Sequence, residues 1–113
     1  MIHLTSDSQI LVETQAVDFR KGIDGLVALC QQNLHQDASS GTLFVFINRA
    51  RTMIRLLAYE QNGYWLMTKR LSKGRYSSWP KSHRPINKMQ AIQLRQLLSG
   101  LLTEPPQVLS HES

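Results

Sequence analysis

The stretch "GTLFVFINRARTMIRLLAYEQNGYWLMTKRL", residues 41–71, decides the fold. Its first part, "TLFVFI", is a continuous β-branched and aromatic run, which predicts a central strand buried on both faces. "NRART" interrupts the run, and "MIRLLAYEQ" resumes strand character up to Asn62-Gly63, a hairpin signal because both residues tolerate positive φ. "YWLMTKRL" then completes a meander of three strands.

Two segments outside this stretch have helical periodicity. Apolar residues recur every three or four positions across residues 23–34, which predicts a helix of about three to four turns, with Asp18 capping a first turn before it. A second apolar stripe covers residues 91–101. Asn87 is its expected N-cap and Gly100 marks its expected end.

Further strands are predicted on both sides of the meander, at Ile10–Glu13 and, as a last edge strand, at Arg75–Trp79, which Pro80 would stop. This order of elements predicts an α+β fold. We expect an antiparallel β-meander of four to five strands with two amphipathic helices packed on one side. Residues 1–103 form a single domain in this interpretation, and residues 104–113 a flexible tail.

The net charge of +5 is unevenly distributed along the chain. Residues 1–47 carry −3 and residues 104–113 carry −2, whereas residues 48–103 carry +10 and contain Glu60 as their single acid. Such asymmetry indicates a polyanionic partner more strongly than the mean charge does.

The meander is expected to bring two groups of cations together, because alternate strand ends meet at one end of a sheet. The predicted nucleic-acid contacts are Arg49, Arg51, Arg55, Lys69, Arg70, Lys73 and Arg75. Tyr76 and Trp79 are candidates for stacking on unpaired bases. The alternative is a solvated rim, with Tyr64, Trp65 and Trp79 packed on the core.

The residues that chemistry would need are sparse. Cys30 is a single cysteine on the apolar stripe of a predicted helix, and the four histidines are scattered, so neither a disulfide nor a four-ligand zinc site is expected. Asp18 and Asp24 suit helix capping better than paired acid–base work. We therefore expect no enzyme activity, no metal, no cofactor and no small-molecule substrate.

Targeting features are also lacking. No apolar run approaches the roughly 20 residues that a membrane helix needs, so no membrane partner is expected. The N-terminal "MIHLTSDSQILVET" has no export-signal pattern, which makes a cytoplasmic location the expectation.

Three segments carry a family resemblance: "VDFRKGIDGL" (17–26), "GTLFVFINRAR" (41–51) and "NGYWLMTKRLSKGRYSSWP" (62–80). In this order they resemble the TnpB-type accessory protein of the insertion sequence family 66, which is not the RNA-guided nuclease of the same name. The resemblance covers roughly residues 4–102. The matching positions are Asp18, Arg20, Lys21, Gly22, Asp24, Gly25, Arg49, Arg51, Lys69, Arg70, Leu71, Gly74, Arg75, Trp79 and Pro80.

The sequence departs from the family pattern in two places. Ser77 and Ser78 stand where the family commonly has one residue, which affects the side-chain direction expected for Trp79, because a one-residue shift in a strand reverses the face. Ala58 stands where an aromatic residue is frequent.

The resemblance implies a bacterial protein encoded in a mobile element beside a separate DDE transposase and required for efficient transposition, without a known chemical step. Our leading hypothesis is a non-enzymatic accessory factor that binds DNA, such as transposon ends, through the basic patch. The alternative is an adaptor that docks on the transposase or a sister accessory protein without touching DNA. Its contact residues would be Asp18, Arg20, Lys21 and Asp24. Exposed edge strands also offer a route to a homodimer.

Overall fold

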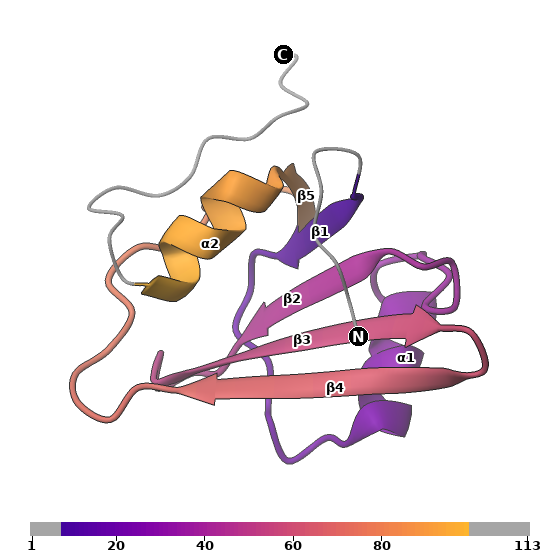
Figure 1. The fold of residues 1–113 in the computed structure, drawn as a ribbon, viewed down its shortest axis with the longest axis horizontal. Helices are drawn as coiled ribbons and strands as arrows, with labels where there is room; N and C mark the ends of the chain where they lie inside the picture. The colour runs from indigo at the N-terminus through magenta and orange to yellow at the C-terminus, as the bar shows by residue number, and fades with distance from the viewer. Residues whose placement is uncertain (1–7, 100–113) are drawn as a thin grey trace.

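Within residues 8–99, the chain folds as one five-stranded sheet with two helices (Figure 1). A computed structural model describes residues 8–99. The elements are β1 (Ile10–Glu13), α1 (Ile23–Gln32), β2 (Leu43–Ile47), β3 (Met53–Glu60), β4 (Gly63–Arg70), β5 (Ile86–Met89) and α2 (Ala91–Ser99). The strand order is β4-β3-β2-β1-β5, so β4 and β5 are the two edges.

The sheet is mixed. β1 runs parallel to β2, with Ile10 aligned to Leu43, whereas the other three neighbouring pairs are antiparallel. The α+β class and the β2–β3–β4 meander are therefore confirmed, and the expectation of a purely antiparallel sheet is wrong. The reason is that α1 connects β1 to β2, and a helical crossover returns the chain in the same direction.

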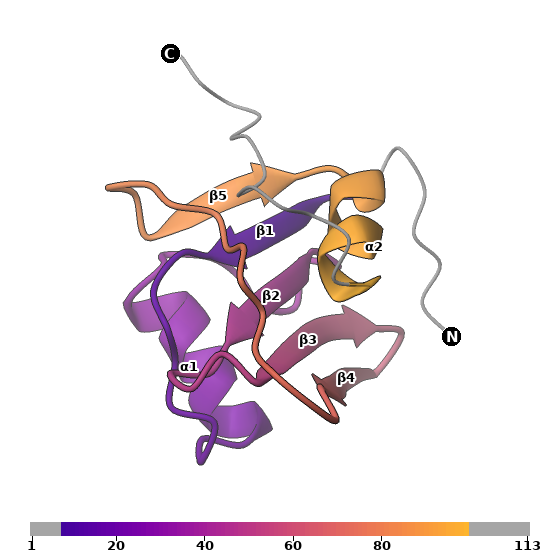
Figure 2. The same cartoon turned by 90° about the vertical axis from the view of Figure 1, so that its left-hand side faces the viewer.

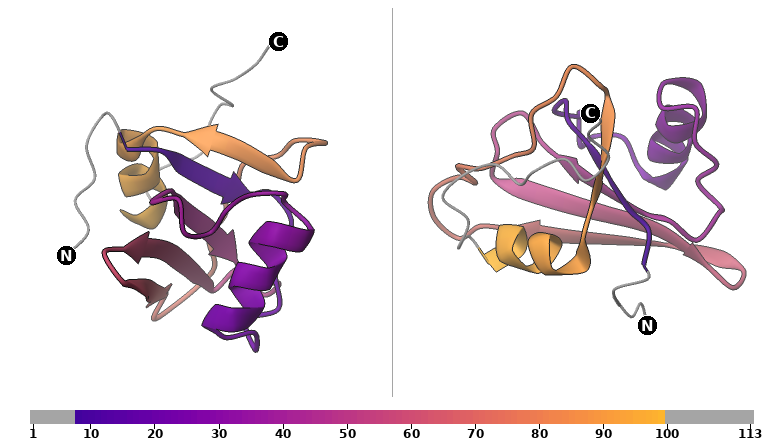
Figure 3. Two further views of the ribbon diagram at one scale, coloured as in Figure 1. Left: turned by 90° about the vertical axis from the view of Figure 1, so that its right-hand side faces the viewer. Right: turned by 90° about the horizontal axis from the view of Figure 1, so that it is seen from above.

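The two helices lie on opposite faces of the sheet (Figures 2 and 3), which corrects the expectation of both on one side. Leu26 of α1 packs with Phe44 and Phe46, while Leu94 of α2 packs with Val45 and other residues of the second face. All five residues of β2 are buried. Because successive side chains of a strand alternate between faces, such a strand needs a covering element on each.

The β3–β4 hairpin is regular along its whole length. Eight consecutive pairs run from Met53–Arg70 to Glu60–Gly63. The turn consists of Gln61 and Asn62, one residue earlier than predicted, and Gln61 has a φ of 61°.

The structure differs from the prediction at two elements of the C-terminal half. Arg75–Trp79 is not a strand, and the fifth strand is β5, in which Asn87 lies opposite Val12 instead of capping a helix. The helix begins later, at Ala91, where the Gln93 side chain accepts a hydrogen bond from the backbone N–H of Gln90 at 2.9 Å. The predicted helix end at Gly100 and the tail lie outside the described residues.

The turn that Asp18 was predicted to cap lies before α1. Asp18 accepts a hydrogen bond from the backbone N–H of Arg20 at 2.9 Å, and the N-cap of α1 itself is Gly22. Asp18 therefore caps a local turn four residues before the helix N-cap.

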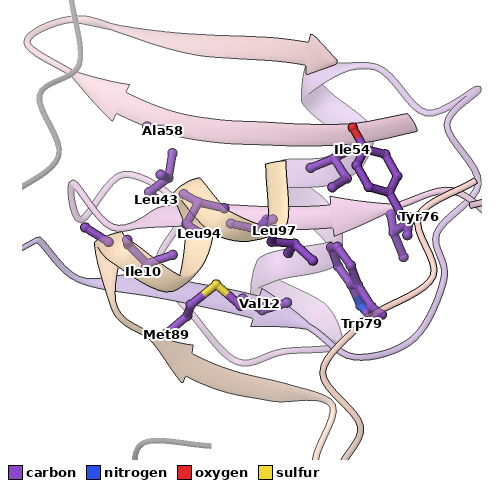
Figure 4. Close-up of a cluster of buried hydrophobic side chains, with 13 residues drawn as sticks. Ile10, Val12, Leu43, Ile54, Ala58, Tyr76, Trp79, Met89, Leu94 and Leu97 are labelled. Carbon is purple, nitrogen blue, oxygen red and sulfur yellow. The ribbon is translucent and has the colours of Figure 1, made fainter. Parts of the chain in front are cut away.

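Residues 71–85, which we call the strap, have no regular structure and cross from β4 at one edge to β5 at the other (Figure 2). Two aromatic residues of the strap, Tyr76 and Trp79, insert into the core beneath α2 (Figure 4). The basic segment is thus anchored by its own aromatic side chains.

Candidate nucleic-acid interface

The β2–β3 turn and the start of the strap lie at the same end of the sheet. The backbone N–H of Leu71 donates to the carbonyl of Thr52 at 2.9 Å, and that of Tyr76 donates to the carbonyl of Arg51 at 2.8 Å. Met53 is paired with Arg70 in the hairpin. The two basic groups that the sequence predicted to meet are therefore joined by backbone hydrogen bonds.

Four of the predicted cations are exposed at this end, and we call them the strand-end surface: Arg49, Arg70, Lys73 and Arg75. Gly74, with a φ of 77°, makes the turn between the last two. The one acid of residues 48–103, Glu60, lies at the opposite end of the hairpin, beside the turn. The strand-end surface therefore has cations from two chain segments and no carboxylate from either.

Asn48 shapes the turn that presents Arg49. Its side-chain oxygen accepts from the backbone N–H groups of Thr52 (2.9 Å) and Met53 (3.0 Å), and its amide donates to the Thr52 hydroxyl at 3.0 Å. The sequence interpretation gave Asn48 no role. An asparagine directly after a buried strand, with a threonine four residues on, is the signal that could have indicated it.

Two other predicted cations have structural contacts. The Arg51 Nε donates to the carbonyl of Tyr76 at 3.2 Å. The Arg55 Nη1 donates to the carbonyls of Phe19 (2.7 Å) and Lys21 (3.2 Å), and the guanidinium lies 4.7 Å from the centre of the Phe19 ring. Arg51 therefore holds the strap, and Arg55 fastens the segment before α1 to β3.

Lys69 lies apart from the strand-end surface. Its Nζ donates to the carbonyl of Leu98 at 2.6 Å, in the last turn of α2. A cation there interacts favourably with the negative end of the helix dipole. Lys69 therefore makes a contact within the protein, on the α2 side of the sheet.

The aromatic residues proposed for base stacking are buried. Tyr76 and Trp79 have exposed fractions of 4% and 2%, and the Trp79 Nε1 donates to the carbonyl of Glu13 at 3.0 Å. Burial raises the pKa of Tyr76, whose hydroxyl has no partner among the described residues. Neither ring is available to a base in this structure. The alternative of core packing holds for Trp79 and for Tyr64, which packs against the core on the other face, but not for Trp65, which is 47% exposed.

The structure shows the surroundings of the two places where the sequence departs from the family pattern. Trp79 points into the core even though Ser77 and Ser78 precede it. Ala58 is buried in the same cluster, opposite Trp65 on β4.

The segment proposed to contact a protein partner is exposed and partly paired. The Arg20 Nη2 lies 2.7 Å from Asp18 Oδ2, and this guanidinium holds the pKa of Asp18 well below its usual range. Lys21 and Asp24 are exposed. A Cβ at Gly25 would lie 2.8 Å from the Lys21 Cβ, so the glycine makes room for this side chain.

A cleft of about 510 Å³ lies between the residues after β1 and the β2–β3 turn. Asp18 and Arg20 line it from one segment, and Arg49 and Arg55 from the others. It thus joins residues of the two sites that the sequence interpretation kept separate.

No group of three or more His, Cys, Asp or Glu side chains within residues 8–99 could hold a metal ion. Burial, and secondarily Glu13, raises the pKa of the Cys30 thiol to about 12, which keeps it protonated. None of the described helices is long and apolar enough to cross a bilayer.

Comparison of the sequence with models of known protein families identifies the family of this chain. A family model described as "IS66 Orf2 like protein" matches residues 8–108. The chain belongs to this family. The resemblance found in the three sequence segments is confirmed, and membership connects the chain with the IS66 insertion sequences and with accessory proteins of transposition.

Two relatives from Sinorhizobium fredii are similar along much of the chain. Uncharacterized protein y4hO is 31% identical over 99 residues, which cover 88% of this chain and 85% of the relative. Uncharacterized protein y4jC is 38% identical over 76 residues, or 67% of this chain, and the match spans 65% of y4jC. No solved structure matches the chain.

Proposed function

We propose that this member of the IS66 Orf2-like family is a non-enzymatic accessory factor of transposition that binds DNA in the bacterial cytoplasm through the strand-end surface. The observation that supports it is the convergence of Arg49 with Arg70, Lys73 and Arg75 at one end of the sheet. Phosphate contacts from arginine and lysine supply most of the affinity of sequence-independent DNA binding.

The scaffold under these cations favours this use. Hydrogen bonds from the strap to Arg51 and Thr52, and the buried Trp79, hold the strap against the sheet. Cations on an anchored backbone lose less conformational entropy on binding than cations on a free loop. Four phosphate contacts predict that log affinity falls against log salt concentration with a slope of roughly −4.

The test is salt-resolved binding to transposon-end and scrambled duplexes by the wild type and two matched double variants. Lys73→Gln/Arg75→Gln removes one lysine and one arginine from the strand-end surface. Lys88→Gln/Arg95→Gln removes the same charges from exposed positions on β5 and α2. The first pair should weaken binding and reduce the slope by about 2, because each lost phosphate contact removes about one unit. The second pair should leave the slope near that of the wild type.

Equal losses of DNA affinity in the two variants would mean that only the total charge of the protein matters. That result would exclude the strand-end surface as a defined binding site. No binding to either duplex at low salt would refute direct DNA contact.

The cleft supports a second candidate function, an adaptor that docks on the transposase. An acidic side chain of a partner could enter it beside Arg49, where the Asp18–Arg20 pair already lines one wall. The same binding experiment, repeated with the transposase present, separates the two. Preference for transposon ends that arises only with the transposase would favour the adaptor.

A further inference from the structure

The two edges of the sheet differ in how well they are protected. β5 is only four residues long and carries the exposed Lys88. β4 has eight residues, an unbroken register against β3 and no proline or bulge. Its middle, Tyr64–Thr68, carries no charge. Soluble proteins usually blunt such an edge with charge, proline or a bulge, so a long regular edge is open to pairing with another strand.

The backbone groups on the free side of β4 follow from its hairpin. Glu60 and Gly63 flank a two-residue turn and form a hydrogen-bonded pair in such hairpins. Since hydrogen-bonded and non-bonded pairs alternate, Tyr64, Leu66 and Thr68 direct their N–H and C=O groups away from β3. These groups repeat every second residue and are arranged symmetrically about Leu66.

The side chains are self-complementary about the same point. An antiparallel copy centred on Leu66 places Trp65 opposite Met67 of the second copy, and Tyr64 opposite Thr68 of the second copy. Trp65 is 47% exposed, one of two large hydrophobic side chains exposed among the described residues. Aromatic rings and methionine sulfur make favourable contacts, and the pair would be of the closely spaced, non-hydrogen-bonded kind.

Charge also favours this arrangement. Antiparallel pairing brings the basic end of one β4, with Lys69 and Arg70, beside the turn end of the other, next to Glu60. Lys69 lies opposite Gly63 of the second copy, so no like charges meet. A parallel pairing would align the two basic ends and set four cations together, which is destabilising.

From these features we propose that the chain forms a two-fold symmetric homodimer in which the β4 edges pair antiparallel, with Leu66 on the symmetry axis. The two sheets then join into one of ten strands. The partner is a second copy of this chain, and the inference does not rest on DNA binding.

Sedimentation of the wild type, from micromolar to near-millimolar concentration, tests the proposal. The wild type should be a dimer that dissociates on dilution. Trp65→Lys should shift the midpoint of dissociation to concentrations at least tenfold higher, because it removes the contact with Met67 of the second copy. Ile92→Lys is the matched control, since Ile92 is the other large exposed hydrophobic residue, at 56%, and lies on α2. It should leave the midpoint unchanged.

A wild type that stays monomeric throughout, or a dimer that Ile92→Lys weakens and Trp65→Lys does not, would overturn the proposal. The register has its own test by oxidative cross-linking. Trp65→Cys/Met67→Cys should form a covalent dimer rapidly, because a non-hydrogen-bonded antiparallel pair has the short Cα separation that disulfides need. Met67→Cys/Lys69→Cys, which pairs only in a register shifted along the strand, should cross-link far more slowly. The reverse order of rates would exclude Leu66 as the centre.

Discussion

The arginines at and near the strand-end surface have different roles. Arg49 and Arg75 are exposed, whereas Arg51 and Arg55 bond backbone carbonyls of the strap and of the segment before α1. The sequence shows all four as cations near strand ends. Only the hydrogen-bond partners separate them, because arginine's planar set of donors can bond a backbone carbonyl as well as a phosphate.

Trp79 is a residue whose role can be tested directly. Trp79→Phe removes the donor to the Glu13 carbonyl while keeping an aromatic ring in the core. We expect a loss of about 1–3 kcal/mol in the free energy of unfolding, because a buried acceptor is left without its partner. Urea denaturation measures it.

The folded variant should bind DNA with the affinity of the wild type if the ring has only a core role. Unchanged stability would show that the hydrogen bond from Trp79 to the Glu13 carbonyl makes no net contribution to folding.

The sequence patterns misassigned the elements whose structure depends on a distant partner strand. β5, "INKM", is short and contains a polar residue and a cation, yet it forms four pairs along β1. The segment at Arg75–Trp79 contains two aromatic residues, which are common in strands, but it pairs with none of the described strands. Strand formation depends on cross-strand packing more than on intrinsic preference.

The end of β1 carries a buried carboxyl group with a testable pH dependence. Burial raises the pKa of Glu13 above 4.5, opposed by a hydrogen bond from the backbone N–H of Gln15. The folded state therefore binds this proton more tightly than the unfolded state. Its contribution to stability is fully present below pH 4.5 and is lost as the pH rises through the folded pKa.

Glu13→Gln should remove this dependence, since the amide is neutral and its oxygen can still accept from Gln15. The variant should gain stability relative to the wild type as the pH is raised from below 4.5 to neutrality. Urea denaturation of both proteins across this range measures the difference. A variant less stable than the wild type at neutral pH would show that the ionised carboxylate makes a net stabilising contact.

At the scale of the whole molecule, the proposed dimer would relate the two strand-end surfaces by its symmetry axis. At about 3.4 Å per residue, the Cα atoms of the two Arg70 residues would lie roughly 27 Å apart along the paired strands. The strand-end surfaces extend further outward, toward the roughly 34 Å of one turn of B-DNA. A single duplex that lies along the paired strands would then reach both surfaces.

This arrangement predicts that dimerisation and DNA binding are coupled. Trp65→Lys should weaken DNA binding and reduce the magnitude of the salt slope by about half, because a monomer contacts half as many phosphates. Titration at protein concentrations where the wild type is dimeric measures both effects, with Ile92→Lys as the control. An unchanged slope in a variant shown to be monomeric would separate the two properties.

The sequence by itself determined the α+β class, the buried central strand and the meander, because alternation and helical periodicity record which side chains are buried locally. It also determined the family, through short motifs in a fixed order. Only the tertiary structure decided the parallel pairing of β1 with β2, the placement of the helices on opposite faces, the strand β5 and the inward direction of Trp79. Each of these depends on which distant segment supplies the partner for a backbone hydrogen bond or an apolar face, and local patterns carry no information about that partner.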